Sequence, residues 1–161
     1  MNEENELPDH WCWTTLGDVG HWSGGGTPSK EREQFWVGGN IPWVSPKDMK
    51  TLRIIDTEDH LSVTALEETS LKLFPAGTVL IVVRSGILQR TLPVAVSQVP
   101  VTINQDLKGI SSEDGIDPVY IAYYLISSEH DILSRCSKDG TTVASIKSES
   151  LKTYPMPLAS N

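Results

Sequence analysis

The side chains best placed to do chemistry in this sequence are hydrogen-bond donors that follow its most apolar segment. Arg84, Ser85, Gln89 and Arg90 come directly after the run TVLIVV at residues 78–83. Arginine donates to O6 and N7 of guanine, and glutamine pairs with adenine, when such side chains reach the base edges of DNA. A loop with these residues at the end of a buried strand is therefore a candidate for reading bases. The ordinary alternative is a solvated hairpin tip.

Three further groups of polar residues lie in predicted turns and are candidates for DNA contacts. Lysine, serine and threonine side chains commonly hold DNA phosphates. The first group is Ser45, Lys47 and Lys50, the second is Asn104 and Gln105, and the third is Lys138, Thr141, Thr142 and Lys147. For the second group the favoured interpretation is structural, because amide side chains often satisfy the backbone of turns. For the third group the alternative is ordinary capping at the end of a helix.

The sequence lacks the patterns that mark common catalytic sites. Residues 117–120 read DPVY, which departs from the D/N-P-P-Y/F loop of DNA methyltransferases at its third position and fits a helix start better. The glycines at 24–26 do not form a G-x-G-x-x-G turn after a strand, and no phosphate-binding P-loop or G-x-S-x-G elbow is present. No cluster of carboxylates marks a nuclease. We therefore expect a non-catalytic protein that binds no cofactor of its own.

Length and residue usage indicate one cytoplasmic domain. The 161 residues are enough to bury one core, and residues 1–6 are expected to form a disordered tail. No apolar run reaches about 18 residues, and the acidic N-terminus lacks the apolar core of a signal peptide, so no membrane association is predicted. Cys12 and Cys136 lie far apart, which favours free thiols, and neither they nor the four histidines have metal-ligand spacing.

The net charge of −8 argues against simple non-specific binding to DNA, because lysine and arginine supply most of that affinity. The distribution of charge matters more than the total. Acidic residues crowd the N-terminal tail and residues 56–68, whereas residues 80–110 carry Arg84, Arg90 and Lys108 against one acid, Asp106. A fold that turns this segment toward DNA would still bind it, weakly when alone. On charge alone, ordinary solvated side chains are the favoured interpretation.

The predicted elements give an α/β (α+β) fold, a single globular domain with a twisted, largely antiparallel sheet and a few short helices. Strands are predicted over residues 13–22, 41–44, 78–83, 94–96, 99–103 and 152–158. The β-branched run at 78–83 is the expected centre of the sheet. Pro42 places its strand at an edge, or lies among the first residues of the strand. The last strand, which contains two prolines, is also expected at an edge.

Turns and helices are predicted from glycine, proline and capping residues. The turn GGGTPS at 24–29 is expected because glycine tolerates positive φ. Thr64 and Glu67 fit a capping box and predict a helix over 65–71. Asp117 and Pro118 predict the start of an amphipathic helix that residues 138–140 close, and 146–151 is a final helical turn. The tryptophans are expected in the core, with the turn at 27–29 bracing them: Trp11, Trp13, Trp22, Trp36 and Trp43.

Five motifs follow one another in an order that is typical of one protein family. They are LPDHW with LGDV behind it (7–19), GGTPS (25–29), W-x-x-G-x-IPW with DM (36–49), NQDLKGI (104–110), and GTT followed by PMPL (140–158). Together they resemble the target recognition domain of the specificity subunit of type I restriction-modification systems. The loop at 84–93 differs from the family's shorter loop at this point, as recognition loops for different sequences should.

The resemblance implies a reader of double-stranded DNA that recognises one half of a bipartite site through its loops. Modification subunits would then methylate adenine and a restriction subunit would cut, and S-adenosylmethionine, ATP and magnesium are expected only in those partners. The family's long spacer helices are absent from this sequence. Residues 1–161 are therefore expected to be either a fragment that carries the first recognition domain or a half-length subunit.

Two rival hypotheses stay open at this point. One is a non-catalytic module that binds a protein or a carbohydrate, with the tryptophans as an exposed platform. The other is a fragment of a nuclease or methyltransferase, which needs a carboxylate cluster or a methyl-donor pocket. The motif content disfavours the second.

Overall fold

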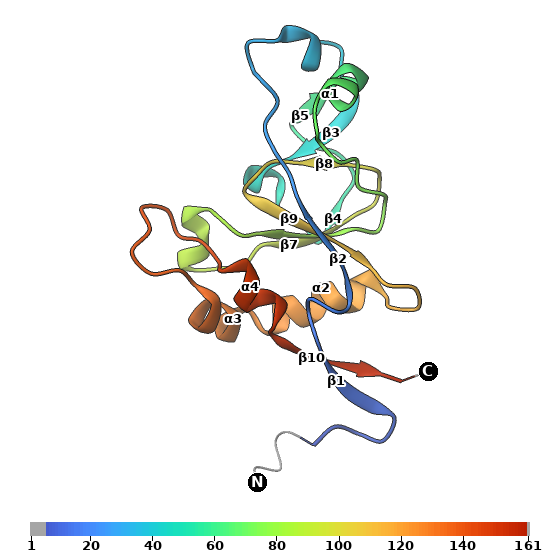
Figure 1. Cartoon of the computed structure of the whole chain (residues 1–161), viewed down its shortest axis with the longest axis vertical. Helices are drawn as coiled ribbons and strands as arrows, with labels where there is room; N and C mark the ends of the chain where they lie inside the picture. Colours follow the sequence, from blue (N-terminus) through green and yellow to red (C-terminus); the bar gives the residue numbers. More distant parts are fainter. Residues whose placement is uncertain (1–5, 161) are drawn as a thin grey trace.

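The computed structural model describes residues 6–160, and in that part of the chain ten strands form three sheets with four short α-helices (Figure 1). The strands are β1 (Trp11–Thr15), β2 (Gly20–Gly24), β3 (Ile41–Val44), β4 (Arg53–Ile54), β5 (Asp59–Leu61), β6 (Val79–Val82), β7 (Val94–Ser97), β8 (Thr102–Ile103), β9 (Leu107–Ser112) and β10 (Pro155–Ala159). The helices are α1 (Val63–Glu68), α2 (Pro118–Ser127), α3 (Glu129–Cys136) and α4 (Ser148–Lys152). Short 3₁₀ helices include η2 (Glu33–Phe35), η3 (Pro46–Asp48) and η4 (Gly86–Gln89). The predicted α/β (α+β) class is confirmed.

The main sheet is built around β6, as its apolar sequence predicted. Its strand order is β2-β9-β6-β7-β4, and only the β4–β7 pair is parallel. All four residues of β6 are fully buried. Leu80 lies opposite Gly109 on one side and Ala95 on the other. A strand buried on both faces needs apolar side chains throughout, which explains why this run does not alternate with polar residues.

The main sheet separates two layers, as Figure 1 shows: the small sheet with α1 lies on one side, and α2, α3 and α4 lie on the other. Helix α2 packs on β6 and β7 through buried Ile121, Ala122 and Leu125. The Asp117 carboxylate caps α2 by accepting a hydrogen bond from the Val119 N–H at 2.8 Å, as predicted. No helix of the described residues is both long and apolar enough to span a bilayer.

The predicted single helix, from Pro118 to the closing residues 138–140, is wrong, because the helix is interrupted at Ser128 between α2 and α3. The Ser127 hydroxyl donates to the Tyr124 carbonyl, which also accepts from the Ser128 N–H. Serine side chains that bond back to the preceding turn weaken a helix in this way. The helix predicted at 65–71 is also shifted, since α1 begins at Val63 after an N-cap at Ser62 rather than at Thr64.

The small sheet has the order β5-β3-β8, so β3 is its middle strand and the edge position considered for it is wrong. The other predicted possibility, that Pro42 lies among the first residues of its strand, is confirmed, since Pro42 is the second residue of β3. Pairing of β3 with β8 begins only at Trp43, opposite Thr102. The missing N–H of Pro42 therefore removes no bond of that ladder. Trp43 packs with Phe35 and other apolar residues in a small core of its own.

The predicted strand at 13–22 is wrong, because its residues belong to two sheets. β1 pairs antiparallel with β10 and brings the two ends of the described chain together, whereas β2 joins β9 at the edge of the main sheet. Between them, Leu16 and Val19 are fully buried. The core expectation for the tryptophans also fails on β1, where Trp11 is 39% exposed and Trp13 48% exposed. The predicted edge strand near the C-terminus is confirmed as β10.

In the GGGTPS turn, close packing requires glycine at position 25, and the expected positive φ does not occur. The positive-φ glycines of the described chain do not include Gly24, Gly25 or Gly26. A Cβ atom on Gly25 would lie 2.0 Å from the carbonyl oxygen of Ile103. The turn braces the tryptophans, as predicted, since the Trp43 and Trp36 indole N–H groups donate to the carbonyls of Gly26 and Ser29.

Gly25→Ala is expected to lower the free energy of unfolding by about 1–3 kcal/mol, because a backbone carbonyl must move to admit the methyl group. Gly26→Ala is the matched control, since its Cβ meets only the Leu71 side chain at 3.8 Å. Its effect should stay within about 0.5 kcal/mol. Urea unfolding followed by tryptophan fluorescence measures both. Equal losses in the two variants would contradict this account of the turn.

Candidate nucleic-acid interface

Two loops that are far apart in the sequence pair with each other beyond the end of β6. These are residues 84–93 and residues 137–147, named here the paired loops, and Figure 1 shows both on the same side of the molecule. The Ser85 N–H donates to the Ala144 carbonyl at 3.0 Å, and the Ile146 N–H donates to the Val83 carbonyl at 2.8 Å. Arg84 and Ser145 form an antiparallel bridge. The backbone therefore holds the two loops in a defined relation.

One open hollow of about 460 Å³ gathers five of the predicted residues. They come from three separate segments of the chain: Arg84, Gln105, Lys138, Thr141 and Thr142. The segment with Gln105 is attached through Asp106, whose carbonyl accepts from the Val83 N–H at 2.8 Å. All five side chains belong to exposed residues. The hollow thus presents guanidinium, ammonium, amide and hydroxyl groups together, which is the donor set that holds phosphates and base edges.

A second hollow, of about 540 Å³, adjoins the same loop. Lys47, Lys50 and Ser85 line it, together with the exposed apolar residue Ile87. The predicted group at residues 45–50 therefore adjoins the paired loops, although the two segments are far apart in the sequence.

The cations of the paired loops are exposed and free of ion pairs within the described chain. No carboxylate of residues 6–160 lies within 4.0 Å of the charged groups of Arg84, Arg90, Lys138 or Lys147. Lys50 shares this property. Charges that are not already neutralised can displace counterions from a phosphate backbone. Although the net charge of the chain is −8, the cations of the paired loops are therefore available to bind phosphates.

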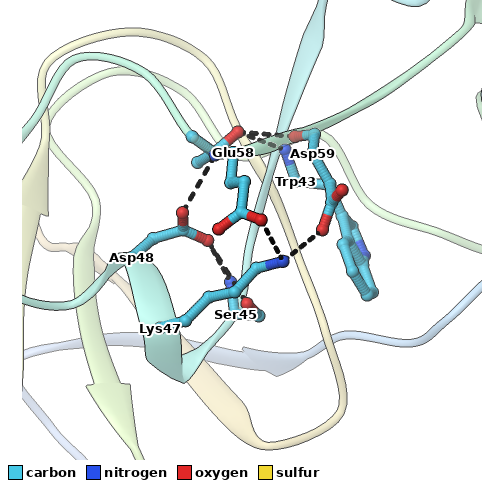
Figure 2. Close-up of polar contacts among 7 residues, drawn as sticks. Trp43, Ser45, Lys47, Asp48, Glu58 and Asp59 are labelled. Atoms are coloured by element: carbon cyan, nitrogen blue, oxygen red, sulfur yellow. Dashed lines mark hydrogen bonds and ion pairs between the residues drawn. The ribbon is translucent and has the colours of Figure 1, made fainter.

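The turn at 45–48 differs from the paired loops, because carboxylates bind both its backbone and its lysine (Figure 2). The Asp48 carboxylate accepts from the Ser45 N–H at 2.9 Å and from the Glu58 N–H at 3.0 Å. The Lys47 ammonium group lies 2.7 Å from Asp59 and 3.5 Å from Glu58. The hydrogen bond with Asp59 raises the pKa of Lys47 above its ordinary value, and the charge of Glu58 adds to this. Ser45 is buried and its hydroxyl lies 3.3 Å from Asp48.

The remaining predicted residues take different positions. Gln89 and Arg90 are exposed at the end of η4, held in place by the buried side chain of Leu88. Asn104 is buried, and its side-chain oxygen accepts from the Asp106 N–H at 2.9 Å, which is the structural role that the sequence favoured. Lys147 is exposed at the N-cap of α4.

Two features of this site could not be predicted from the sequence. The Thr27 hydroxyl donates to the Gln105 side-chain oxygen at 2.6 Å, so the GGGTPS turn reaches the edge of the first hollow. Ile87 stands exposed on η4 beside the second hollow. Nothing in the local pattern distinguishes Ile87 from the buried Leu88 that follows it. Among the described residues, no group of three or more His, Cys, Asp or Glu side chains gathers to hold a metal ion.

Comparison with known proteins places this architecture in a family. Residues 8–160 match the type I restriction modification DNA specificity domain. The chain is 44% identical over 146 residues to the specificity subunit of the type I restriction enzyme EcoR124I/EcoR124II of Escherichia coli, and the match covers 91% of this chain and 36% of that protein. It is 34% identical over 161 residues to the MjaIX specificity subunit of Methanocaldococcus jannaschii, with 96% and 35% covered.

Solved structures share the fold. The crystal structure of the HsdS subunit from Thermoanaerobacter tengcongensis superposes with a TM-score of 0.69 at 21% identity, over 99% of this chain and 36% of that one. A structure of a type I restriction-modification system superposes with a TM-score of 0.72 at 20% identity, over 99% of this chain and 37% of that chain.

The chain belongs to the family of type I restriction-modification DNA specificity domains, as its ordered motifs predicted. It spans about a third of the length of the relatives that it matches. The family is one of DNA specificity domains and not of catalytic ones, which confirms the expectation of a non-catalytic chain.

Asp48→Ala is expected to destabilise the domain by about 1–2 kcal/mol, because the N–H groups of Ser45 and Glu58 lose their acceptor. Glu149→Ala, which removes only an exposed ion pair with Lys152, should cost no more than about 0.5 kcal/mol. Chemical unfolding followed by circular dichroism compares the two. A loss for Asp48→Ala no larger than that of the control would show that the turn does not depend on this carboxylate.

Proposed function

We propose that this chain is a single target recognition domain that reads one half of a bipartite site in double-stranded DNA. The observation that carries the proposal is the convergence of unpaired cations with amide and hydroxyl groups at the paired loops. Three segments that are distant in the sequence contribute to it. A surface of that composition suits a duplex, whose grooves present acceptors between two lines of phosphates.

The side chains divide by the chemistry that each offers. We assign base contacts to Arg84, Gln89 and Arg90, since guanidinium and amide groups match guanine and adenine edges. Phosphate contacts are assigned to lysine and hydroxyl side chains. These are Lys50, Ser85, Lys138, Thr141, Thr142 and Lys147, with Gln105 at their edge. Ser45 and Asn104 shape the neighbouring turns. The charge of Lys47 is already shared with Asp59 and Glu58, so we assign it a weaker phosphate contact.

In the complete system the domain would direct chemistry that other subunits perform. Modification subunits would bind S-adenosylmethionine and methylate adenine, and a restriction subunit would use ATP and magnesium to move and cut DNA in the cytoplasm. The domain alone would bind DNA at micromolar or weaker affinity with strong salt dependence, because few phosphate contacts oppose a net charge of −8. Two recognition domains on a rigid spacer would raise the effective concentration and hence the affinity.

The deciding experiment is a domain exchange. This domain replaces one recognition domain in a type I specificity subunit of known target, and single-molecule methylome sequencing reads the adenine methylation of cells that make the complex. We expect one half of the bipartite motif to change and the other half to stay. If the complex assembles but the methylated motif is lost or unchanged, the recognition function is refuted.

Substitutions in the paired loops should separate base contacts from phosphate contacts. Arg84→Ala and Arg90→Ala are expected to relax the preference at single base positions, each by about 1–3 kcal/mol. Lys147→Ala is expected to weaken binding to all sequences alike and to reduce the salt slope by about one. Lys30→Ala, which removes an exposed lysine outside the paired loops, is the charge control. Unchanged methylation specificity in both arginine variants would remove these residues from the site.

The alternative of a protein- or carbohydrate-binding module has one observation in its favour, the exposure of Trp11 and Trp13 on β1. Trp22, Trp36 and Trp43 do not extend this surface, because each donates its indole N–H to a backbone carbonyl of the domain. The two functions differ in their response to DNA: a module that works through β1 has tryptophans that iodide quenches and does not bind DNA, whereas the proposed reader shows DNA binding by fluorescence anisotropy.

A further inference from the structure

Ile87 is an apolar side chain in the middle of the polar recognition loop. It is 37% exposed, whereas its neighbour Leu88 is 4% exposed and packs into the core. Exposed polar residues lie before it and after it on the same loop, among them Arg84, Gln89 and Arg90. A single exposed isoleucine is common on protein surfaces and by itself indicates nothing. Ile87 differs from Ile55, which is more exposed, because it lies on the same loop as the three strongest candidates for base contacts.

The tip that carries Ile87 is held by its own hydrogen bonds. The Leu88 N–H donates to the Ser85 carbonyl at 3.1 Å, and the Ile87 carbonyl accepts from the N–H groups of Arg90 and Thr91, each at 2.9 Å. The Ser85 N–H in turn donates to Ala144 on the other loop. The side chain is therefore presented on a fixed backbone, and little conformational entropy of the chain is lost when it meets a partner.

The surroundings of Ile87 point to a nucleic-acid partner. It lines the second hollow with Lys50, Ser85 and several apolar residues, and the carboxylate of Glu129 in that lining accepts a hydrogen bond from the Leu92 N–H. The cation of Lys50 in the same lining, and those of Arg84 and Arg90 on the same loop as Ile87, have no ion pair among residues 6–160. An exposed apolar side chain with unpaired cations on the same loop suits a partner that carries negative charge beside an apolar group. The major groove of DNA has that arrangement, and its apolar group is the 5-methyl group of thymine.

We propose that Ile87 contacts the 5-methyl group of a thymine in the recognised half-site, so that this domain reads an A·T pair at one position by an apolar contact. The proposal rests on the DNA-reading function proposed above. Arg84, Gln89 and Arg90 then read or position the neighbouring pairs from the same loop. A cytosine carrying a 5-methyl group is not the proposed ligand, and a response to it is a separate outcome of the test.

The test uses the complex with the exchanged domain and a duplex that carries its methylated motif. Each thymine of the new half-site is replaced in turn by uracil, which removes only the methyl group, and Kd is measured by fluorescence anisotropy. We expect one replacement to weaken binding about fourfold, the factor for one methyl-sized apolar group. Ile87→Ala should bind the thymine duplex about fourfold more weakly and show no difference between thymine and uracil at that position.

Matched variants keep the outcomes distinct. Ile55→Ala, which removes an exposed isoleucine outside the paired loops, should keep both the affinity and the uracil effect. Ile87→Val should give an intermediate loss. If no half-site thymine responds to uracil in the unsubstituted complex, or if Ile87→Ala keeps the full uracil effect, the proposal is overturned while the half-site reading stands. A gain with 5-methylcytosine that depends on Ile87, without any thymine response, overturns it equally. Loss of the half-site itself would refute the proposed function instead.

Discussion

The burial of β6 on both faces is the constraint from which the candidate interface follows. Its residues have no exposed surface, with β9 along one side and β7 along the other. Where the strand leaves the core at Val83, its N–H and carbonyl groups are taken by Asp106 and Ile146, which belong to two other segments. Arg84 therefore lies at the surface where the end of β6 meets the segments of Asp106 and Ile146. A hydrophobic requirement in the sheet thus determines where a guanidinium group appears.

Charge at the site is a local property and not one of the whole chain. An acidic domain would repel DNA if its charge were evenly spread. Here several cations away from the paired loops lie in ion pairs, as Arg135 with Asp131 and Lys152 with Glu149 do. The cations of the paired loops have no such partner among residues 6–160. Lys47 lies between these cases, because its charge is shared with Asp59 and Glu58 at the border of the second hollow. The cations of the paired loops are therefore available to phosphates although the net charge of the chain is −8.

The GGGTPS turn connects packing with the site. Gly25 approaches Ile103 closely enough to exclude a side chain, the carbonyls of Gly26 and Ser29 hold two tryptophans, and Thr27 bonds to Gln105. The turn therefore supports the small core around Trp43 and the edge of the first hollow at once. The hydrogen bond between Thr27 and Gln105 links this turn directly to a residue of the site.

The sequence by itself determined the features that depend on neighbouring residues. The β-branched run became the central strand, Asp117 capped α2, and the ordered motifs identified the family. The tertiary structure decided what depends on distant contacts: the division of residues 13–22 between two sheets, the exposure of Trp11, and the meeting of Arg84 with Gln105 and Lys138. Capping, turn chemistry and strand preference act over a few residues, so they are visible in a sequence. Which loops meet is set by how whole sheets and helices pack, and no short stretch of residues contains that information.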